Sequence, residues 1–256
     1  MLRRGGPVRP SPPLLAASAR PWAGALVACC AVLVAVLGVL VADQTQPDRF
    51  DRAVDSPVIA WFTGHQGLAL WLAFPASTIP AAVLSAAIVI TCLLTRRPNG
   101  AVLAAVAVPA VAALNDGLIK HLVHRTYLGL LSYPSGHTAT MSALAATLTV
   151  LLLIPPRPAR ARLMQRLIPA ACLLAIVVAI GVIGLRWHYF TDTLAGSAEG
   201  IATVTALALL LDLPPVSQRL DRLTAYIPVT RPTGQQTQSN PSPAPEAPIS
   251  APPPKS

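Results

Sequence analysis

Six long apolar stretches limit what this chain can fold into more than any other feature of its sequence. Each approaches or exceeds the roughly 20 apolar residues that cross the hydrocarbon core of a bilayer. They lie at residues 22–42, 67–94, 99–121, 136–154, 166–186 and 190–211. Only 11% of the residues are charged, against about 25% in soluble domains. The sequence therefore predicts an all-α, polytopic membrane protein with six transmembrane helices.

The second stretch and the segment before it are less regular. Pro75 and Pro80 predict that this stretch is kinked or tilted, or that it begins with an interfacial piece. Residues 53–65 are too short to span a bilayer and include Trp61 and Phe62. They are predicted to form either an amphipathic helix with its aromatic rings at headgroup level or an ordered loop.

The basic residues indicate the orientation in the membrane. The two terminal segments and the connections after the second and fourth stretches together hold 14 of the 19 basic residues. Because Lys and Arg concentrate in cytoplasmic segments, both termini are predicted to be cytoplasmic. The run from Trp22 to Ala42 is too long for the apolar core of a signal peptide, so we interpret it as a retained first helix.

The domain organisation follows from this topology. We expect a basic cytoplasmic segment at 1–21, one membrane domain at 22–211 and a cytoplasmic Pro/Ser-rich tail at 212–256, disordered from about residue 230. The net charge of +9 comes from residues dispersed between the stretches, so no nucleic-acid partner is expected. Arg far outnumbers Lys, and the residues Ala, Val and Pro are abundant. This composition is typical of a GC-rich gene and points to a bacterial source, so we expect the protein in a bacterial cell membrane.

Polar residues gather in three groups at the non-cytoplasmic ends of the last four stretches. The groups are Lys120 to Arg125, Tyr133 to His137 and Arg186 to Asp192. Ionisable residues beside transmembrane segments are costly to place and are usually functional. The three groups therefore predict one site, at a single depth on the outer face of the membrane.

The first two groups contain residues suited to binding phosphate. Ser135 and Gly136 open a predicted helix, where exposed N–H groups and the helix dipole favour an anion. His137, at the start of that helix, can donate a proton to a leaving oxygen. Lys120 and Arg125 supply positive charge for phosphate oxygens.

The third group supplies a nucleophile. His188 and Asp192 are four residues apart, so on a helix the carboxylate can orient the imidazole and leave its other nitrogen free to attack. Nearby, Asp116 is predicted to pair with Lys120, four residues later. Glu199, inside the last stretch, needs a partner that the sequence does not identify.

Together the groups resemble the signature motifs of the type-2 phosphatidic acid phosphatases, also called lipid phosphate phosphatases, which share a core with vanadium haloperoxidases. The resemblance is carried by Lys120 to Arg125, by Pro134-Ser135-Gly136-His137 and by His188-x-x-x-Asp192, and it covers roughly residues 53 to 211. It implies a helical-bundle phosphatase core in the bilayer and a membrane lipid phosphate as substrate.

The resemblance also implies a metal-independent mechanism without a cofactor. His188 would attack phosphorus to form a phosphohistidine, Asp192 would orient it, and His137 would protonate the leaving lipid oxygen. The groups expected to hold the phosphoryl oxygens are Lys120, Arg125 and the amides around Ser135 and Gly136. The expected substrates are a polyprenyl diphosphate first, followed closely by phosphatidic acid and phosphatidylglycerol phosphate.

The chain departs from the family pattern in two places. The family usually has Arg-Pro seven residues after the lysine of the first motif, where this chain has Tyr127-Leu128. It usually has Ser-Arg before the third motif's histidine, where this chain has Gly181-Val182. Arg186 lies one helical turn after Val182 and is predicted to fill the phosphate-binding role of the missing arginine.

Two other functions stay open on these observations. The same chemistry could pass the phosphoryl group to an acceptor other than water, as in a lipid phosphotransferase. The missing Ser-Arg pair is also what a non-catalytic relative that binds lipid in the membrane would show, although the intact His137, His188 and Asp192 argue against it.

Overall fold

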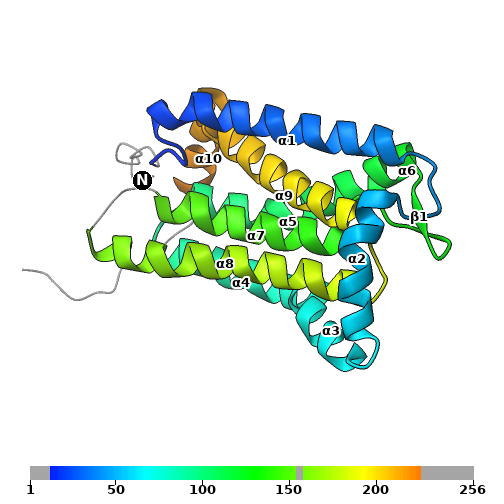
Figure 1. The fold of residues 1–256 in the computed structure, drawn as a ribbon. Helices are drawn as coiled ribbons and strands as arrows, with labels where there is room; N and C mark the ends of the chain where they lie inside the picture. Colours follow the sequence, from blue (N-terminus) through cyan, green and yellow to red (C-terminus); the bar gives the residue numbers. More distant parts are fainter. Residues whose placement is uncertain (1–11, 154–157, 226–256) are drawn as a thin grey trace, which may run out of the picture.

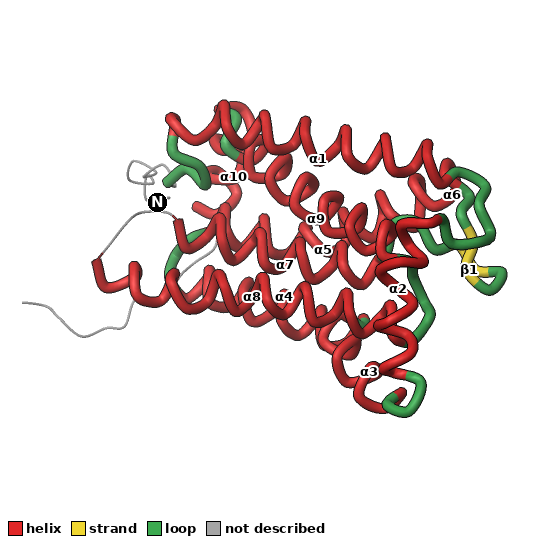
Figure 2. Tube along the Cα trace, in the orientation of Figure 1, coloured by secondary structure: helices red, strands yellow, loops and turns green. Residues whose placement is uncertain are grey.

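The computed structural model describes residues 12–153 and 158–225 as a bundle of long helices (Figure 1). Within these ranges the strands are limited to β1 (Thr126–Tyr127) and β2 (Leu130–Leu131), which form a short antiparallel hairpin (Figure 2). The all-α prediction is thus confirmed. The basic residues of the N-terminus up to residue 11 and the tail from residue 226 lie outside the described residues.

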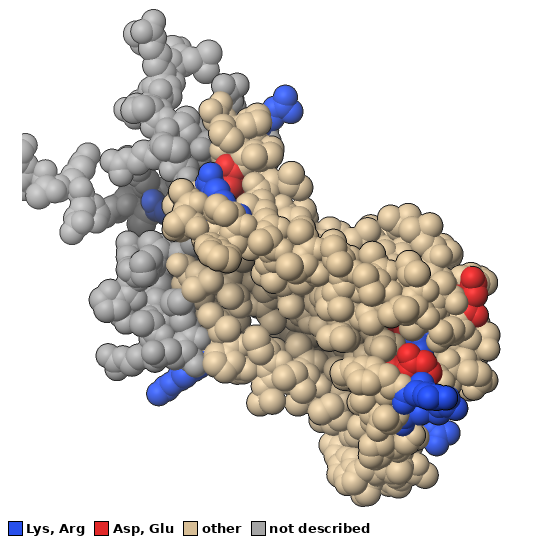
Figure 3. Space-filling model, turned by 45° about the horizontal axis from the view of Figure 1, so that its top comes forward, with Lys and Arg blue, Asp and Glu red and all other residues tan. Residues whose placement is uncertain are grey.

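Six helices in the described part of the chain are long and apolar enough to cross a membrane, which confirms the predicted number. They are Ala17–Val41, Gln66–Leu94, Pro98–Val123, Gly136–Leu153, Arg166–Gly184 and Phe190–Leu211. Large apolar side chains such as Val39 and Leu94 are exposed on them, as lipid contact requires. Figure 3 shows charged side chains gathered at the two ends of the molecule, with uncharged residues along the length between them.

The spans are built from shorter elements in places. The helices are η1 (Ala17–Ala19), α1 (Arg20–Val41), α2 (Arg49–Phe62), α3 (Gln66–Ala73), η2 (Phe74–Ala76), α4 (Thr78–Leu94), α5 (Pro98–Leu114), the π-helical η3 (Asn115–Ile119), α6 (Lys120–Val123), α7 (Gly136–Leu153), α8 (Pro158–Gly184), α9 (Phe190–Leu211) and α10 (Pro214–Ala225). The irregularity predicted for the second span is the 3-10 turn η2, which contains Pro75. Helix α10 was not predicted, because its residues were assigned to the tail.

Helix α2 decides between the two predictions for residues 53–65. The segment is helical and runs across one end of the bundle (Figure 1). Trp61 is exposed, in line with a headgroup-level ring, but Phe62 is buried. It is buried because its ring packs against Gly184 of α8, where a Cβ atom would overlap it.

Helices α7 and α9 form the packed centre of the bundle. Gly196 and Gly200 of α9 face α7 so closely that a Cβ atom at either position would overlap a backbone carbonyl, of Ser135 and Ala139 respectively. Small residues at such a crossing let two helix backbones approach within the bilayer. This approach brings the first turns of α7 and α9 together.

The two described ends of the chain meet at the end of the bundle opposite α2 (Figure 1). The backbone N–H groups of Leu14 and Leu15 donate to the carboxylate of Asp212 at 2.6 and 2.8 Å. Arg20 pairs with the same carboxylate at 3.5 Å. An even number of spans requires this arrangement, because it returns the chain to the side from which it started.

Candidate active site

The three predicted polar groups meet at the end of the bundle that α2 crosses. The first group occupies α6 and the turn into β1, the second precedes and begins α7, and the third joins α8 to α9 (Figure 1). The ring centroids of His137 and His188 are 6.4 Å apart, and Lys120 is close enough to His137 for their charges to interact. The clustering inferred from sequence is therefore present.

His188 is held through one ring nitrogen. Its Nδ1 lies 2.9 Å from the backbone carbonyl oxygen of Ser132 and 3.9 Å from Oδ2 of Asp192. A carbonyl oxygen can only accept, so Nδ1 carries the proton and the lone pair of neutral His188 is on Nε2. This tautomer is the one that a nucleophilic histidine requires.

Asp192 is fully buried at the third position of α9. Its Oδ2 accepts a hydrogen bond from the Tyr189 backbone N–H at 3.1 Å, which forms a capping box at the start of the helix. Its Oδ1 accepts from Arg125 Nη1 at 2.7 Å. Both oxygens are therefore fixed, and the carboxylate holds one position relative to His188.

The residues before and at the start of α7 lie as predicted but with one amide already engaged. The Ser135 N–H donates to the Asp192 carbonyl at 3.0 Å, so it is not available to an anion. The Ser135 hydroxyl is buried and has no partner within the described part of the chain. His137 is in the first turn, with its ring centroid 5.4 Å from that of Trp187.

Lys120 begins α6 directly after the π-helical turn η3. Its ammonium pairs with Asp116 at 2.7 Å, as predicted from their spacing. A π-turn inserts an extra residue into a helix and often lies at a functional site. Here it changes the direction in which the last turn, with Lys120, presents its side chains.

Arg125 has a different environment from the phosphate pocket expected for it. Its guanidinium is fully buried, donates to Asp51, Asp192 and Thr191, and lies 4.2 Å from the ring centroid of Tyr189. Burial alone would lower the pKa of Arg125, but Asp192 and Asp51 outweigh it and raise the pKa above its usual value. The contacts of Arg125 are those of a structural cation between two carboxylates.

Asp51 and Asp55 were not identified from the sequence. They lie on one face of α2 and accept the backbone N–H groups of Thr191 at 2.9 Å and Phe190 at 3.1 Å. These amides belong to the first turn of α9, where helices have no internal partner for them. Two acidic residues four apart in a short amphipathic helix were the available signal, but their partners are about 140 residues away in the chain.

Arg186 is in a different environment from Gly181 and Val182, which occupy the positions of the missing Ser-Arg pair. Gly181 and Val182 are buried, with Gly181 facing the α3 backbone at Ala73, so these positions serve helix packing. Arg186 has a left-handed backbone (φ 59°) and an exposed side chain. Its charge partly offsets the rise that burial causes in the pKa of Tyr127. Arg186 is thus at the same end of the bundle, and its phosphate-binding role stays a prediction.

Glu199 has the partner that the sequence left open. Asn115, in η3, donates to Glu199 Oε2 at 2.6 Å, and both side chains are buried. The Asn115 Oδ1 atom faces Gly136, at 3.7 Å from where a Cβ atom would lie. This pair therefore joins the helices that carry Lys120, His137 and Asp192.

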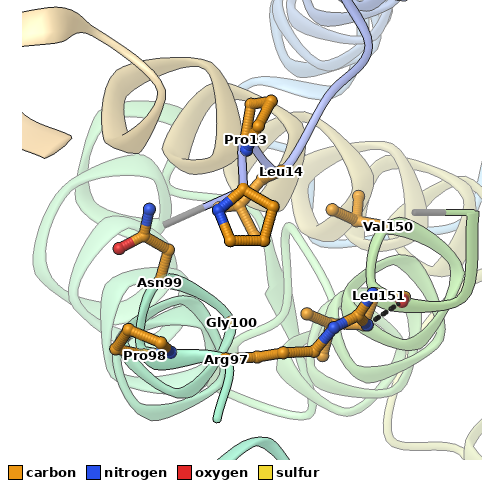
Figure 4. Close-up of a pocket in the computed structure, with 9 residues that line it drawn as sticks. Pro13, Leu14, Arg97, Pro98, Asn99, Gly100, Val150 and Leu151 are labelled. Atoms are coloured by element: carbon orange, nitrogen blue, oxygen red, sulfur yellow. Dashed lines mark hydrogen bonds between the residues drawn. The ribbon is translucent and has the colours of Figure 1, made fainter. Parts of the chain in front are cut away.

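Among the cavities formed by the described residues, two lie at opposite ends of the molecule. One of about 560 Å³ opens beside the site, between α2 and the hairpin. It is lined by Thr45, Gln46, Pro47, Arg52, Asp55, Ser56, Ile59, Thr126, Tyr127, Leu128, Gly129 and Tyr189. The other, around Leu14, Arg97 and Leu151 (Figure 4), measures about 20 Å³, which is room for about one water molecule. Of these two, the first is the larger, and its lining includes the polar side chains of Thr45, Arg52 and Asp55.

Comparisons with known proteins agree with this architecture. A search of curated proteins finds no match to the chain. Among solved structures, the fold is similar to that of a transmembrane PAP2 type phosphatidylglycerolphosphate phosphatase from Bacillus subtilis, with a TM-score of 0.58 and 15% identity over 71% of this chain and 93% of that one. The sequence profile of the PAP2 superfamily matches residues 21–213, which include all three polar groups. The chain therefore belongs to the PAP2 superfamily.

Proposed function

We propose that this protein is a metal-independent lipid phosphate phosphatase that works through a phosphohistidine. The observation that carries the proposal is the fixed tautomer of His188, whose Nδ1 is held by the Ser132 carbonyl while the ring of His137 lies 6.4 Å away. A nucleophile and a proton donor thus lie near one another, as the transfer of a phosphoryl group requires. Membership of the PAP2 superfamily supports the same chemistry.

In the first step, the Nε2 lone pair of His188 attacks phosphorus and forms a P–N bond. The bond between phosphorus and the lipid oxygen breaks, and that oxygen takes a proton from His137. The imidazole of His188 becomes positively charged, and Asp192 stabilises that charge. The step yields the dephosphorylated lipid and phosphohistidine.

In the second step, water attacks phosphorus and gives its proton to His137. The P–N bond breaks, its electrons return to Nε2 of His188, and inorganic phosphate leaves. Both histidines regain their starting protonation. Most of the barrier reduction in such transfers comes from positioned positive charge and fixed donors.

The phosphoryl oxygens need such donors, and the site offers several. In this proposal they are held by Lys120, the Ser135 hydroxyl, the amides of Gly136 and His137, and Arg186. The unpartnered, buried Ser135 hydroxyl supports its inclusion. Arg125 is given a positioning role instead, because carboxylates already surround it.

The proposed substrate is a lipid phosphomonoester or terminal pyrophosphate at the outer face of a bacterial cell membrane. A polyprenyl diphosphate comes first, followed by phosphatidic acid and phosphatidylglycerol phosphate. The fold neighbour is named as a phosphatase of the last of these lipids, and a cavity of about 560 Å³ between α2 and the hairpin lies beside the site. Gly181 and Val182 favour the non-catalytic alternative, since no arginine side chain comes from those positions.

The test is phosphate release from a panel of these lipids, in detergent with EDTA. Wild type is compared with His188→Ala and with His121→Ala, which alters an exposed histidine next to Lys120 that has no role in the proposed mechanism. We expect release by wild type and His121→Ala and loss in His188→Ala, by about 10³-fold or more for a removed nucleophile. Transfer of phosphate to an added alcohol in place of release would identify a phosphotransferase. Inactivity on every lipid would favour the non-catalytic alternative.

A further inference from the structure

A buried row of charged side chains leads from α2 to the proposed nucleophile. Asp51 accepts from Arg125 Nη2, Arg125 Nη1 donates to Asp192 Oδ1 at 2.7 Å, and Asp192 Oδ2 lies 3.9 Å from His188 Nδ1. The side chains of Asp51, Arg125 and Asp192 are 0% exposed. Because they are shielded from water, their charges act on one another strongly.

The balance of charge in this row favours a cation at His188. Two carboxylates and one guanidinium leave one excess negative charge. Without the Asp51 charge, the positive charge of Arg125 would offset the charge of Asp192 only. The Asp192 carboxylate would then attract a cationic His188 weakly. With Asp51 present, the guanidinium is shared, and Asp192 keeps the negative character that stabilises an imidazolium.

Asp51 also fixes the backbone that carries Asp192. Its Oδ1 accepts the Thr191 N–H at 2.9 Å, and its Oδ2 accepts the Thr191 hydroxyl at 3.1 Å. Thr191 directly precedes Asp192 in the first turn of α9. The same carboxylate therefore holds both the cation and the helix turn on which the Asp192 position depends.

We propose that Asp51 is a positioning residue for catalysis, which shares Arg125 with Asp192, so that the Asp192 carboxylate stays oriented toward His188 with its charge available to the imidazole. The inference rests on the proposed function, because it assigns His188 as the nucleophile. It makes α2, which lies outside all three signature groups, part of the catalytic apparatus. It also gives the buried Arg125 a role as the link between Asp51 and Asp192, in place of the phosphate-binding role predicted from the sequence.

The first test is kinetic. Asp51→Asn keeps the shape and an oxygen acceptor for the Thr191 N–H but removes the charge, and we expect kcat to fall with little change in KM. The fall should be about 10- to 100-fold, the range seen when the outer partner of a metal-ligating histidine is removed. The matched control is Asp48→Asn, which removes a carboxylate at the N-cap of the same helix, where Asn caps equally well.

Restoring the balance of charge should restore part of the activity. In Asp51→Asn/Arg125→Met the guanidinium is also gone, so no buried cation competes with His188 for the Asp192 carboxylate. We expect a higher kcat for this double variant than for Asp51→Asn alone. A purely structural role for Asp51 predicts the opposite, because the double variant loses more of the packing and hydrogen bonding around α9. An equal loss of kcat in Asp48→Asn would likewise overturn the proposal.

A second readout does not need catalysis. The protein is produced with isotope-labelled histidine, and the histidine side-chain signals are followed by NMR as the pH is changed. The His188 signal is identified by its absence in His188→Ala. The pKa of His188 should fall in Asp51→Asn, because a negative charge is removed, and return toward the wild-type value in the double variant. The other charged or titratable groups near the site stay in place: His137, Lys120, Asp55 and Arg186. An unchanged His188 pKa in Asp51→Asn rejects the inference even if the lipid assay finds no activity at all.

Discussion

Two carboxylates of α2, those of Asp51 and Asp55, accept hydrogen bonds from the first turn of α9, but they differ in how many donors they have. Asp51 has three donors, whereas Asp55 accepts only from Phe190 and its Oδ2 has no partner within the described part of the chain. Burial raises the pKa of Asp55 to about 7, and the negative charge of Asp51 adds to the rise. Asp55 therefore gains and loses its proton near neutral pH.

The raised pKa of Asp55 makes stability depend on pH. The folded state binds this proton up to about pH 7, whereas the unfolded chain releases it near pH 4. Stability from this group is thus complete below about pH 4 and decreases as the pH rises toward 7. We expect Asp55→Asn to raise the melting temperature in detergent at pH 8 relative to wild type, with a smaller difference at pH 5. A difference that is constant between these pH values would contradict this assignment.

Local spacing predicted part of the site and could not predict the rest. His188 and Asp192 are one helical turn apart, so their proximity follows from the sequence alone. The partners of Arg125 are 74 and 67 residues away, and its burial depends on where α2 packs. The single arginine of the first group was therefore assigned to phosphate, although its nearest charges are carboxylates.

The approach of α7 to α9 is the feature at element scale that creates the site. Gly196 and Gly200 remove the side chains that would separate the two helices, and the Ser135 N–H can then reach the Asp192 carbonyl. That hydrogen bond joins the second and third polar groups directly. The geometry between the two proposed catalytic histidines depends on this contact.

A methyl group at Gly200 should therefore push the two helices apart. We expect Gly200→Ala to destabilise the protein by about 1–3 kcal/mol, as overpacking typically does, and to lower its melting temperature in detergent. The matched control is Gly24→Ala in α1, where no atom lies within 4 Å of the added Cβ. If both variants melted at the same temperature, the close contact of Gly200 with Ala139 would not limit stability.

Elements that contact lipid were easier to predict than those that cover the site. The six spans follow from hydropathy, because a bilayer requires about 20 apolar residues per crossing. Helix α2 has a buried face that contains Asp51 and Asp55, so hydropathy gives no reason to bury it. The π-turn η3 could not be predicted either, because it is a change of backbone hydrogen bonding within a largely apolar helix and has no pattern in the sequence.

At the scale of the whole molecule, the distribution of basic residues and the path of the chain indicate the same orientation in the membrane. The described chain begins and ends at one end of the bundle, joined through Asp212. The proposed site lies at the other end, with α2 and the hairpin (Figure 1). The terminal segments and the two connections that the sequence predicts on the cytoplasmic side hold 14 of the 19 basic residues. Such an imbalance sets the orientation of membrane proteins during insertion.

This imbalance predicts that both termini are cytoplasmic and that the site faces outward. In a bacterial host, a fluorescent protein that folds only in the cytoplasm should fluoresce when fused after Ala225. Alkaline phosphatase, which is active only outside the cytoplasm, should be active when inserted at Gly129 in the hairpin turn and inactive when fused after Ala225. A fusion after Arg97, between the second and third spans, is the internal control and should behave like the one after Ala225. Activity at Ala225 and Arg97 with none at Gly129 would invert the topology, and the proposed substrate would then have to be a lipid of the cytoplasmic leaflet.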